Sequence, residues 1–245
     1  MGAIKDTTNK LTKEGRKALK VAWCGAVIVA AGSARRMEGI DKIMMDFGGQ
    51  PLIMRTVDAF NQCDAIKEIV IVTRAELVTQ LMHLCAGIPK VTAIVTGGDT
   101  RQKSVELGIA ALSKKAKLVA VQDGARPFVT WQLIDRVVRA AGTYGAAVPG
   151  IAVKDTIKEV GGGIVKGTPE RKNLRAIQTP QAFDIDLLKG ALKKAADDGI
   201  EITDDASAVE HMGMSVKLVD GDERNFKITT PMDLKIAYML LEEEK

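Results

Sequence analysis

A buried strand that runs directly into a glycine turn is predicted by the sequence Ala26-Val27-Ile28-Val29-Ala30-Ala31-Gly32, and the fold can be worked out from it. Its apolar residues are continuous rather than alternating, which is typical of a strand covered on both faces of a parallel sheet. Further apolar runs of this kind follow along the chain. They lie at Ile66–Val72, Val91–Val95, Lys117–Val121 and Ala146–Val153.

Segments with helical periodicity separate these runs. In one of them Val105, Ile109 and Leu112 recur at i, i+4 and i+7 and form one apolar stripe. The alternation predicts an α/β fold, a Rossmann-like and mostly parallel sheet flanked by helices, which binds ligands where strand carboxyl ends meet loops. The expected helices are Leu52–Gln62, Ala75–Cys85, Arg101–Leu112, Thr130–Ala141, Ile185–Ala195 and Pro231–Leu241, with a short one at Thr203–Met212.

The first apolar run also permits a different interpretation. Basic residues at Lys17–Lys20, the apolar run Val21–Ala31 and the small residues after it resemble a signal peptide. We favour the strand, because cleavage would remove the first strand and leave Arg35-Arg36-Met37 without a scaffold. The run is too short to span a bilayer, so we expect no membrane association.

Composition and charge narrow the class of protein. Of the 245 residues, 46% are hydrophobic and 27% are charged, which excludes a disordered or collagen-like chain. The net charge of +4 lies entirely in residues 1–20, and aromatic residues are only 4%, so we expect no nucleic-acid partner. We predict an N-terminal extension, 1–20, and a single domain, 21–245. The three cysteines and two histidines favour neither a disulfide framework nor a zinc site, and indicate a reducing, cytoplasmic location.

A projecting hairpin is predicted at Lys154–Gln178. Apolar residues around Ile157 and Ile164 flank the turn sequence Gly161-Gly162-Gly163. An isolated hairpin is marginally stable in water, so we interpret this segment as a dimerisation arm that packs on a second subunit. A mobile surface loop is the alternative.

Three loops that follow strands carry candidate chemistry. The first, Ala30 to Lys42, combines glycine and alanine with Arg35, Arg36 and Lys42, which suits phosphate groups, although both the Walker A and GxGxxG patterns are absent. The second contains Gly97-Gly98-Asp99 and Ser104 and allows close approach to a ring or ribose. In the third, Asp123 can bind Mg²⁺ or a sugar hydroxyl. Ordinary turns, with solvated cations or an Asp123–Arg126 pair, remain the alternative.

The order of the motifs is more informative than any single one. The chain reads A-A-G-x-x-x-R-M with a lysine five residues on, then G-G-D-x-R-x-x-S-V, D-G-A-R-P, V-K-D-T-I-K, T-P-Q-x-F, T-D-D-A-S-A-V-E and K-I-T-T-P-x-D-L. In this order and spacing it resembles the 2-C-methyl-D-erythritol 4-phosphate cytidylyltransferase family. The resemblance covers about Gly25–Leu241.

The resemblance implies an activity and its partners. Members of that family transfer CMP from CTP to 2-C-methyl-D-erythritol 4-phosphate, giving 4-diphosphocytidyl-2-C-methyl-D-erythritol and pyrophosphate in the non-mevalonate isoprenoid pathway. It implies a nucleotidyltransferase-type fold, a divalent cation such as Mg²⁺, and a homodimer whose hairpin arm reaches its partner. The attacking phosphate is already an anion, so the reaction needs charge neutralisation and in-line positioning rather than a general base.

The resemblance also implies roles for individual residues. The catalytic positions are Arg36 and Lys42, which stabilise the transition state, and Arg171 and Lys227, which orient the acceptor phosphate. The metal position is Asp123, with the metal held mainly by the CTP phosphates. The CTP-binding positions are Ala30, Ala31, Gly32, Arg35, Gly97, Gly98, Asp99, Ser104, Asp123 and Ala125, and the acceptor-binding positions are Arg126, Thr156, Arg171, Thr179 and Lys227.

Two residues depart from the family pattern, and three other functions stay open. The family usually has glycine at Ala34 and proline at Asp41, and Asp41 adds an anion beside the triphosphate site. The alternatives are a ribitol-5-phosphate cytidylyltransferase, a sugar-1-phosphate nucleotidyltransferase and a non-catalytic nucleotide sensor of the same fold. A sensor would tolerate loss of Arg36 or Lys42, and both are present.

Overall fold

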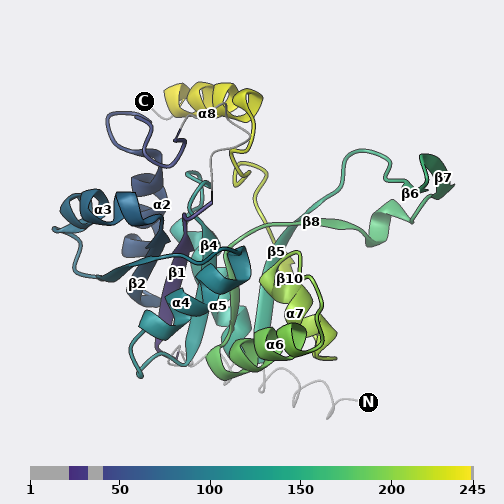
Figure 1. Cartoon of the computed structure of the whole chain (residues 1–245). Coiled ribbons are helices and arrows are strands. Elements are labelled where there is room, and N and C mark those ends of the chain that lie inside the picture. The colour runs from purple at the N-terminus through teal and green to yellow at the C-terminus, as the bar shows by residue number, and fades with distance from the viewer. Residues whose placement is uncertain (1–21, 33–40, 244–245) are drawn as a thin grey trace, which may run out of the picture.

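An eight-stranded mixed sheet forms the centre of the protein (Figure 1). The computed structural model describes residues 22–32 and 41–243. Strand β1 (Cys24–Val29) lies between β2 (Ile66–Thr73) and β4 (Leu118–Asp123), and β3 (Val91–Thr96) lies outside β2. All of these neighbours pair in parallel. The strand interpretation of the first apolar run is therefore confirmed, whereas the predicted extension, 1–20, lies outside the described residues.

The other half of the sheet departs from the parallel pattern. Strand β9 (Gln181–Asp184) lies antiparallel between β4 and β5 (Ala146–Ala152). Strand β10 (Lys217–Asp220) pairs parallel to β5, and β8 (Arg175–Ile177) pairs antiparallel to it. The sequence predicted β5 but not β8, β9 or β10, because these three are short and lack a continuous apolar run.

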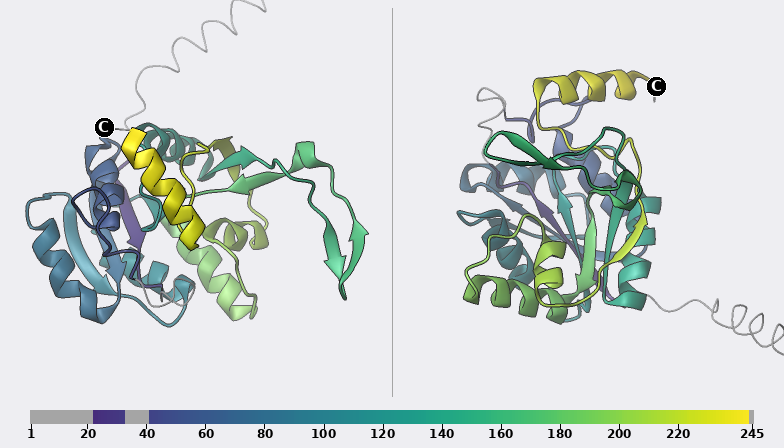
Figure 2. Two further views of the ribbon diagram at one scale, coloured as in Figure 1. Left: turned by 90° about the horizontal axis from the view of Figure 1, so that it is seen from above. Right: turned by 90° about the vertical axis from the view of Figure 1, so that its right-hand side faces the viewer.

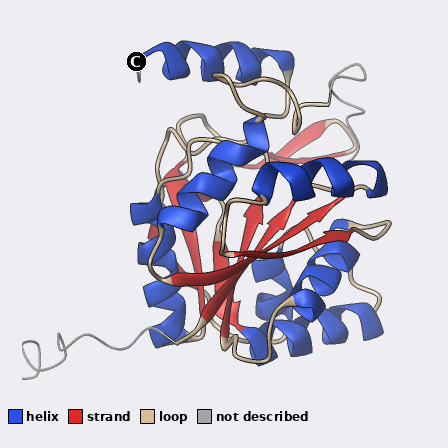
Figure 3. Cartoon of the chain, turned by 90° about the vertical axis from the view of Figure 1, so that its left-hand side faces the viewer, coloured by secondary structure: helices blue, strands red, loops and turns tan. Residues whose placement is uncertain are grey.

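Helices cover both faces of the sheet (Figure 3). One hydrophobic cluster joins the sheet to α2 (Leu52–Gln62), α3 (Val78–Cys85) and α5 (Trp131–Tyr144). A second cluster joins the opposite face to α4 (Arg101–Ala111), α6 (Ile185–Asp197) and α7 (Asp205–His211). In β1, Ala26 and Ile28 belong to the first cluster and Val27 to the second, which explains why the strand is apolar throughout.

The predicted helices are present, with small shifts at their ends. The segment predicted as one helix from Ala75 begins as the 3₁₀ helix η2 (Ala75–Leu77) and continues as α3. Thr130 caps α5 as predicted, since its side chain accepts a hydrogen bond from the Leu133 N–H. None of the helices in the described part of the chain combines the length and the apolar character needed to cross a membrane.

Helix α8 (Pro231–Glu243) lies at the top of the molecule in Figure 1. Its Ala237 and Leu241 pack into a third, smaller cluster with Phe47, Phe128 and Ile228. The hydroxyl of Tyr238 on α8 donates to the Asp46 carbonyl at 2.8 Å. These contacts fix the segment just before α8, which carries candidate residues, against the body of the protein.

The predicted hairpin projects away from the sheet (Figure 2). Strands β6 (Glu159–Gly161) and β7 (Ile164–Gly167) form it, and the short helix η3 (Arg171–Asn173) follows. The predicted turn at the glycines is confirmed, because Gly162 and Gly163 have φ of 60° and 77°. Val160 and Ile164 are 62% and 64% exposed, so the hairpin leaves apolar side chains uncovered within this chain.

Candidate active site

A cleft of about 490 Å³ opens at the carboxyl ends of β1, β3 and β4. Ligands of open α/β folds bind at this edge of the sheet, where the carboxyl ends of the strands meet the loops. Residues from five separate stretches of the sequence line the cleft, and most of the predicted CTP-binding positions are among them. The lining residues are Val29, Ala30, Ala31, Gly32, Lys42, Ile43, Gly98, Asp99, Thr100, Arg101, Ser104, Asp123, Gly124, Ala125, Lys227 and Thr229.

Backbone hydrogen bonds bring the strand-end loops together. The Ala30 N–H donates to the Val72 carbonyl at 2.7 Å, and the Gly97 N–H donates to the Thr73 carbonyl at 2.8 Å. On the other side of β1, the Gly124 N–H donates to the Val29 carbonyl at 2.9 Å. The parallel ladder thus continues one residue into each loop, so the loops are held at fixed spacing around the cleft.

At Gly97 a side chain fits only if a neighbouring group moves. A Cβ atom at this position would lie 2.5 Å from Ala31 Cβ and 2.8 Å from Ser104 Oγ. Ser104 is buried, and its hydroxyl accepts from the Gly98 N–H at 3.1 Å while donating to the Thr100 carbonyl at 3.0 Å. Gly97 therefore forms the contact between the first and second loops, and Ser104 shapes the second loop from behind.

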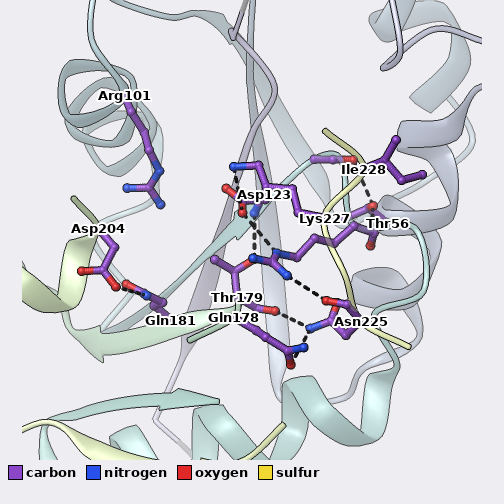
Figure 4. Close-up of polar contacts among 12 residues, drawn as sticks. Thr56, Arg101, Asp123, Gln178, Thr179, Gln181, Asp204, Asn225, Lys227 and Ile228 are labelled. Carbon is purple, nitrogen blue, oxygen red and sulfur yellow. Dashed lines mark hydrogen bonds and ion pairs between the residues drawn. The ribbon is translucent and has the colours of Figure 1, made fainter. Parts of the chain in front are cut away.

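Asp123 is the centre of a cluster of cations (Figure 4). Its Oδ2 lies 3.1 Å from Arg126 Nε and 3.2 Å from Lys227 Nζ. Burial raises the pKa of Asp123, but Lys227, Arg126 and Arg101 together outweigh burial and hold that pKa below its ordinary value. At neutral pH the cleft therefore contains an ionised carboxylate that two cations contact.

Arg126 and Thr179, which were predicted at the acceptor, form the wall behind Asp123. Arg126 is 9% exposed and donates through Nη1 to the Asn225 carbonyl at 2.8 Å. The Thr179 hydroxyl accepts from the Asp123 N–H at 3.1 Å, and the Thr179 carbonyl accepts from Asn225 Nδ2 at 2.8 Å. Neither residue is among those that line the cleft. Their contacts fix the position of the Asp123 carboxylate (Figure 4).

Lys42 and Lys227 reach the cleft from segments far apart in the sequence. Lys42 Nζ donates to the Ile228 carbonyl at 2.9 Å, so it contacts the residue next to Lys227. The Ile228 N–H in turn donates to the Ala125 carbonyl at 2.9 Å. The loop after β1, the loop after β4 and the segment before α8 are therefore joined at one point.

Arg101 is a cleft residue to which the sequence assigned no role. Its Nη2 lies 2.7 Å from Oδ2 of Asp205, which is completely buried at the start of α7. Burial raises the pKa of Asp205, and the Arg101 guanidinium opposes that increase. Both residues lie in motifs that the sequence contains, G-G-D-x-R and T-D-D-A-S, but their pairing depends on how α4 and α7 pack.

Not every predicted residue lies in this cleft. Thr156 and Arg171 lie on the projecting segment, and Arg171 Nη1 donates to the Lys154 carbonyl at 2.7 Å. Neither of them lines the cleft of this chain. Ala34, Arg35 and Arg36 lie outside the described residues.

Known proteins resemble this chain over nearly its whole length. The family model described as 2-C-methyl-D-erythritol 4-phosphate cytidylyltransferase matches residues 24–243. The protein of that name from Geobacillus kaustophilus is 43% identical over 219 residues, which cover 88% of this chain and 96% of that protein. Its counterpart from Symbiobacterium thermophilum is 44% identical over 220 residues, covering 89% and 92%.

Solved structures give the same result. The 4-diphosphocytidyl-2C-methyl-D-erythritol synthase of Anaerococcus prevotii superposes with a TM-score of 0.82 at 31% identity, covering 91% of this chain and 98% of that one. The 2-C-methyl-D-erythritol 4-phosphate cytidylyltransferase of Thermus thermophilus superposes with a TM-score of 0.73 at 36% identity, covering 90% and 99%. The predicted α/β fold and the predicted resemblance are both confirmed.

Proposed function

This chain belongs to the 2-C-methyl-D-erythritol 4-phosphate cytidylyltransferase family, and we propose that the cleft at the carboxyl ends of β1, β3 and β4 is its active site. The enzyme is a CTP-dependent cytidylyltransferase of the isoprenoid pathway. It transfers CMP from CTP to methylerythritol phosphate and releases pyrophosphate. The observation that carries the assignment of the site is the convergence of Lys42, Arg101 and Lys227 on the cleft that contains the ionised carboxylate of Asp123.

The cations of the cleft suit the chemistry of the reaction. A phosphate oxygen of the acceptor forms a bond to the α-phosphorus of CTP, and the bond from that phosphorus to the oxygen of the leaving pyrophosphate breaks. The nucleophile carries negative charge at neutral pH, so no residue has to remove a proton from it. Lys42 and Lys227 then stabilise charge that builds up on the phosphate oxygens, as preorganised cations do in other phosphoryl transfers.

The two glycine loops suit the two ends of CTP. Ala30, Ala31 and Gly32 line the cleft, and because the Ala30 N–H is bonded within the sheet, the N–H groups of Ala31 and Gly32 are the ones offered to the triphosphate. Gly98, Asp99 and Ser104 lie on the other side, where the small residues Gly98 and Ser104 leave room for the cytidine. The roles of Arg35 and Arg36 at the triphosphate stay predictions from the sequence.

A divalent cation fits this arrangement. Within residues 22–32 and 41–243 no cluster of three or more His, Cys, Asp or Glu side chains is suited to hold a metal. Mg²⁺ commonly needs only one or two carboxylates together with substrate phosphates, and Asp123 is an ionised carboxylate in the cleft. We propose that Asp123 and the CTP phosphates hold Mg²⁺, which supplies further charge neutralisation when bound.

We propose that the acceptor site is completed by a second subunit. Thr156 and Arg171 belong to the segment that carries β6, β7 and η3, and this arm extends away from the main sheet (Figures 1 and 2). The arm leaves Ile157, Val160, Ile164 and Val165 exposed, and a two-fold partner would cover them. In such a homodimer the arm of one chain brings Arg171 to the phosphate of methylerythritol phosphate beside Lys227 of the other.

A cytoplasmic location is the last part of the proposal. The described cysteines, Cys24, Cys63 and Cys85, are all free thiols that lie inside the protein. Free thiols are typical of a reducing compartment, where CTP is also available.

Pyrophosphate release tests the function directly. The purified protein is incubated with CTP, Mg²⁺ and either methylerythritol phosphate or ribitol 5-phosphate, and pyrophosphate is measured in each. We expect release with methylerythritol phosphate and little with ribitol 5-phosphate. Release with ribitol 5-phosphate alone would contradict the acceptor, and release with neither would contradict catalysis.

A further inference from the structure

Arg74 lies directly after β2, and each nitrogen of its guanidinium has a different partner. Nε donates to Glu76 Oε1 at 2.7 Å, Nη1 donates to the Gly32 carbonyl at 3.3 Å, and Nη2 forms an ion pair with Oδ2 of Asp41. The side chains of Arg74 and Asp41 are 22% and 31% exposed, so the pair is partly shielded from solvent. One side chain thus holds a residue that lines the cleft and the residue next to Lys42.

The end of β2 is the right place for such contacts. The carbonyls of Val72 and Thr73 accept the N–H groups of Ala30 and Gly97, so this strand end lies between the first and second loops of the cleft. Arg74 is the next residue. Its side chain therefore starts from a backbone that the sheet fixes on both sides.

Asp41 connects Arg74 to Lys42. Its second carboxylate oxygen, Oδ1, accepts from the Ile43 N–H at 3.2 Å, and its carbonyl accepts from the Met44 N–H at 3.2 Å. These two bonds form the turn on which Lys42 lies. Asp41 therefore uses one oxygen to shape the turn and the other to attach that turn to Arg74.

The charge of Asp41 needs a counter-charge in this position. The carboxylate lies next in sequence to a residue that lines the cleft, where the triphosphate of CTP would bind. A carboxylate without a partner there would repel the triphosphate, and an ion pair with arginine removes most of that repulsion. Arginine suits this role, because the several N–H groups of its planar guanidinium can contact a carboxylate and a carbonyl at the same time.

From these contacts we propose that Arg74 is a positioning residue for CTP: it neutralises Asp41 and joins Asp41 to Gly32 across the first loop. The inference rests on the proposed function, because the binding of CTP is what it concerns. Arg74 lies outside the cleft lining and acts on the nucleotide only through Asp41 and Gly32. It is not a group that contacts the reacting atoms.

A double-mutant cycle in the full-length protein tests the proposal, with KM for CTP and kcat measured from pyrophosphate release. Loss of one charge-assisted contact corresponds to about a tenfold change, so Arg74→Ala is expected to raise KM for CTP about tenfold and to change kcat less. In a chain that already carries Asp41→Asn, the same substitution is expected to raise KM less than about threefold, because no unpaired anion remains. Arg74→Lys keeps the charge and is expected to retain most of the affinity.

Arg139→Ala is the matched control. It removes an arginine that pairs with Asp135 at 2.6 Å on α5, away from the cleft, and KM is expected to stay unchanged. The inference would be overturned if Arg74→Ala raised KM for CTP equally with Asp41 and with Asn at position 41. It would also be overturned if KM for CTP stayed unchanged in Arg74→Ala while the variant unfolded at the wild-type temperature. No pyrophosphate release from the wild type would instead contradict the proposed function, and the inference would fail with it.

Discussion

Lys227 Nζ lies 3.2 Å from Asp123 Oδ2, which joins the segment before α8 to the end of β4 at the floor of the cleft. Arg126 contacts the same oxygen from the buried side, so Asp123 has a structural partner behind it and a cation of the cleft in front. The position of Lys227 therefore depends on a carboxylate that the protein core holds in place.

Substitution of Asp123 tests how much this carboxylate contributes to the free energy of unfolding. Asp123→Asn leaves Arg126 buried without its counter-charge, and loss of one partner of a buried pair typically costs about 3 kcal/mol in the free energy of unfolding. The cost should depend on pH. Because the folded pKa of Asp123 lies below its ordinary value of 3.8, the carboxylate stabilises the fold above that pH and ceases to do so as the pH falls through the folded pKa.

Thermal and urea unfolding at several pH values measure this effect. The difference between wild type and Asp123→Asn is expected to be constant near neutral pH and to shrink in acid. Asp135→Asn, at a surface pair, is the control and should change stability little. A difference between wild type and Asp123→Asn that grows as the pH is lowered would contradict the assigned pKa direction.

Lys42→Ala is expected to lower kcat more than it weakens CTP binding. Loss of one preorganised contact to transition-state charge typically costs about 3 kcal/mol, or about a hundredfold in rate. The measurement is kcat from pyrophosphate release together with the Kd of CTP from calorimetry. Lys193→Ala, which removes a surface lysine paired with Asp197 on α6, is the control. A near-normal kcat in Lys42→Ala would show that Lys42 does not act on the transition state.

Gly97→Ala is expected to weaken CTP binding through geometry alone. The added Cβ would lie 2.5 Å from Ala31 Cβ, so one of the two loops has to move. Overpacking of this kind typically costs about 1–3 kcal/mol, and we expect about a tenfold rise in KM for CTP. Gly87→Ala is the matched control, because nothing lies within 4 Å of a Cβ there. Equal kinetics in both variants would show that the contact between the loops is unimportant for the nucleotide.

The sequence predicted those parts of the fold that local patterns determine. The strands with continuous apolar runs, such as β1 and β4, were recognisable because both of their faces are buried. Strand β9 was not, since its residues Gln181 to Asp184 mix polar and apolar side chains and its place in the sheet depends on pairing with β4 and β5.

The same distinction applies to the cleft. Its loops were predicted because each follows a strand and contains glycine. The pairs Arg101–Asp205 and Arg74–Asp41 were not, because each joins residues that only tertiary packing brings together. The Asp123–Arg126 pair was predicted only as an alternative to a ligand-binding role, because a turn sequence does not reveal which side chain faces the interior, and the structure contains this pair.

Deletion of Val160–Gly167 tests whether the arm holds two subunits together and completes the acceptor site. The deleted residues include exposed Val160, Ile164 and Val165, and they form no part of the main sheet. The body should therefore fold, while the apolar surface proposed to lie between subunits is lost. We expect a monomer by analytical ultracentrifugation, CTP binding close to that of the wild type, and loss of turnover with methylerythritol phosphate.

Substitution of Arg171 separates the two roles of the arm. Arg171→Ala leaves the exposed apolar side chains in place, so the protein should stay a dimer that binds CTP, while KM for methylerythritol phosphate rises. Removal of a contact between a charged group and its ligand corresponds to about a tenfold change or more. Lys172→Ala, whose ammonium pairs with Glu170 at 2.8 Å on the same arm, is the control for a general loss of charge. A deletion variant that remains a fully active dimer would exclude a site shared through the arm, and a normal KM in Arg171→Ala would exclude Arg171 as the residue that reaches the acceptor phosphate.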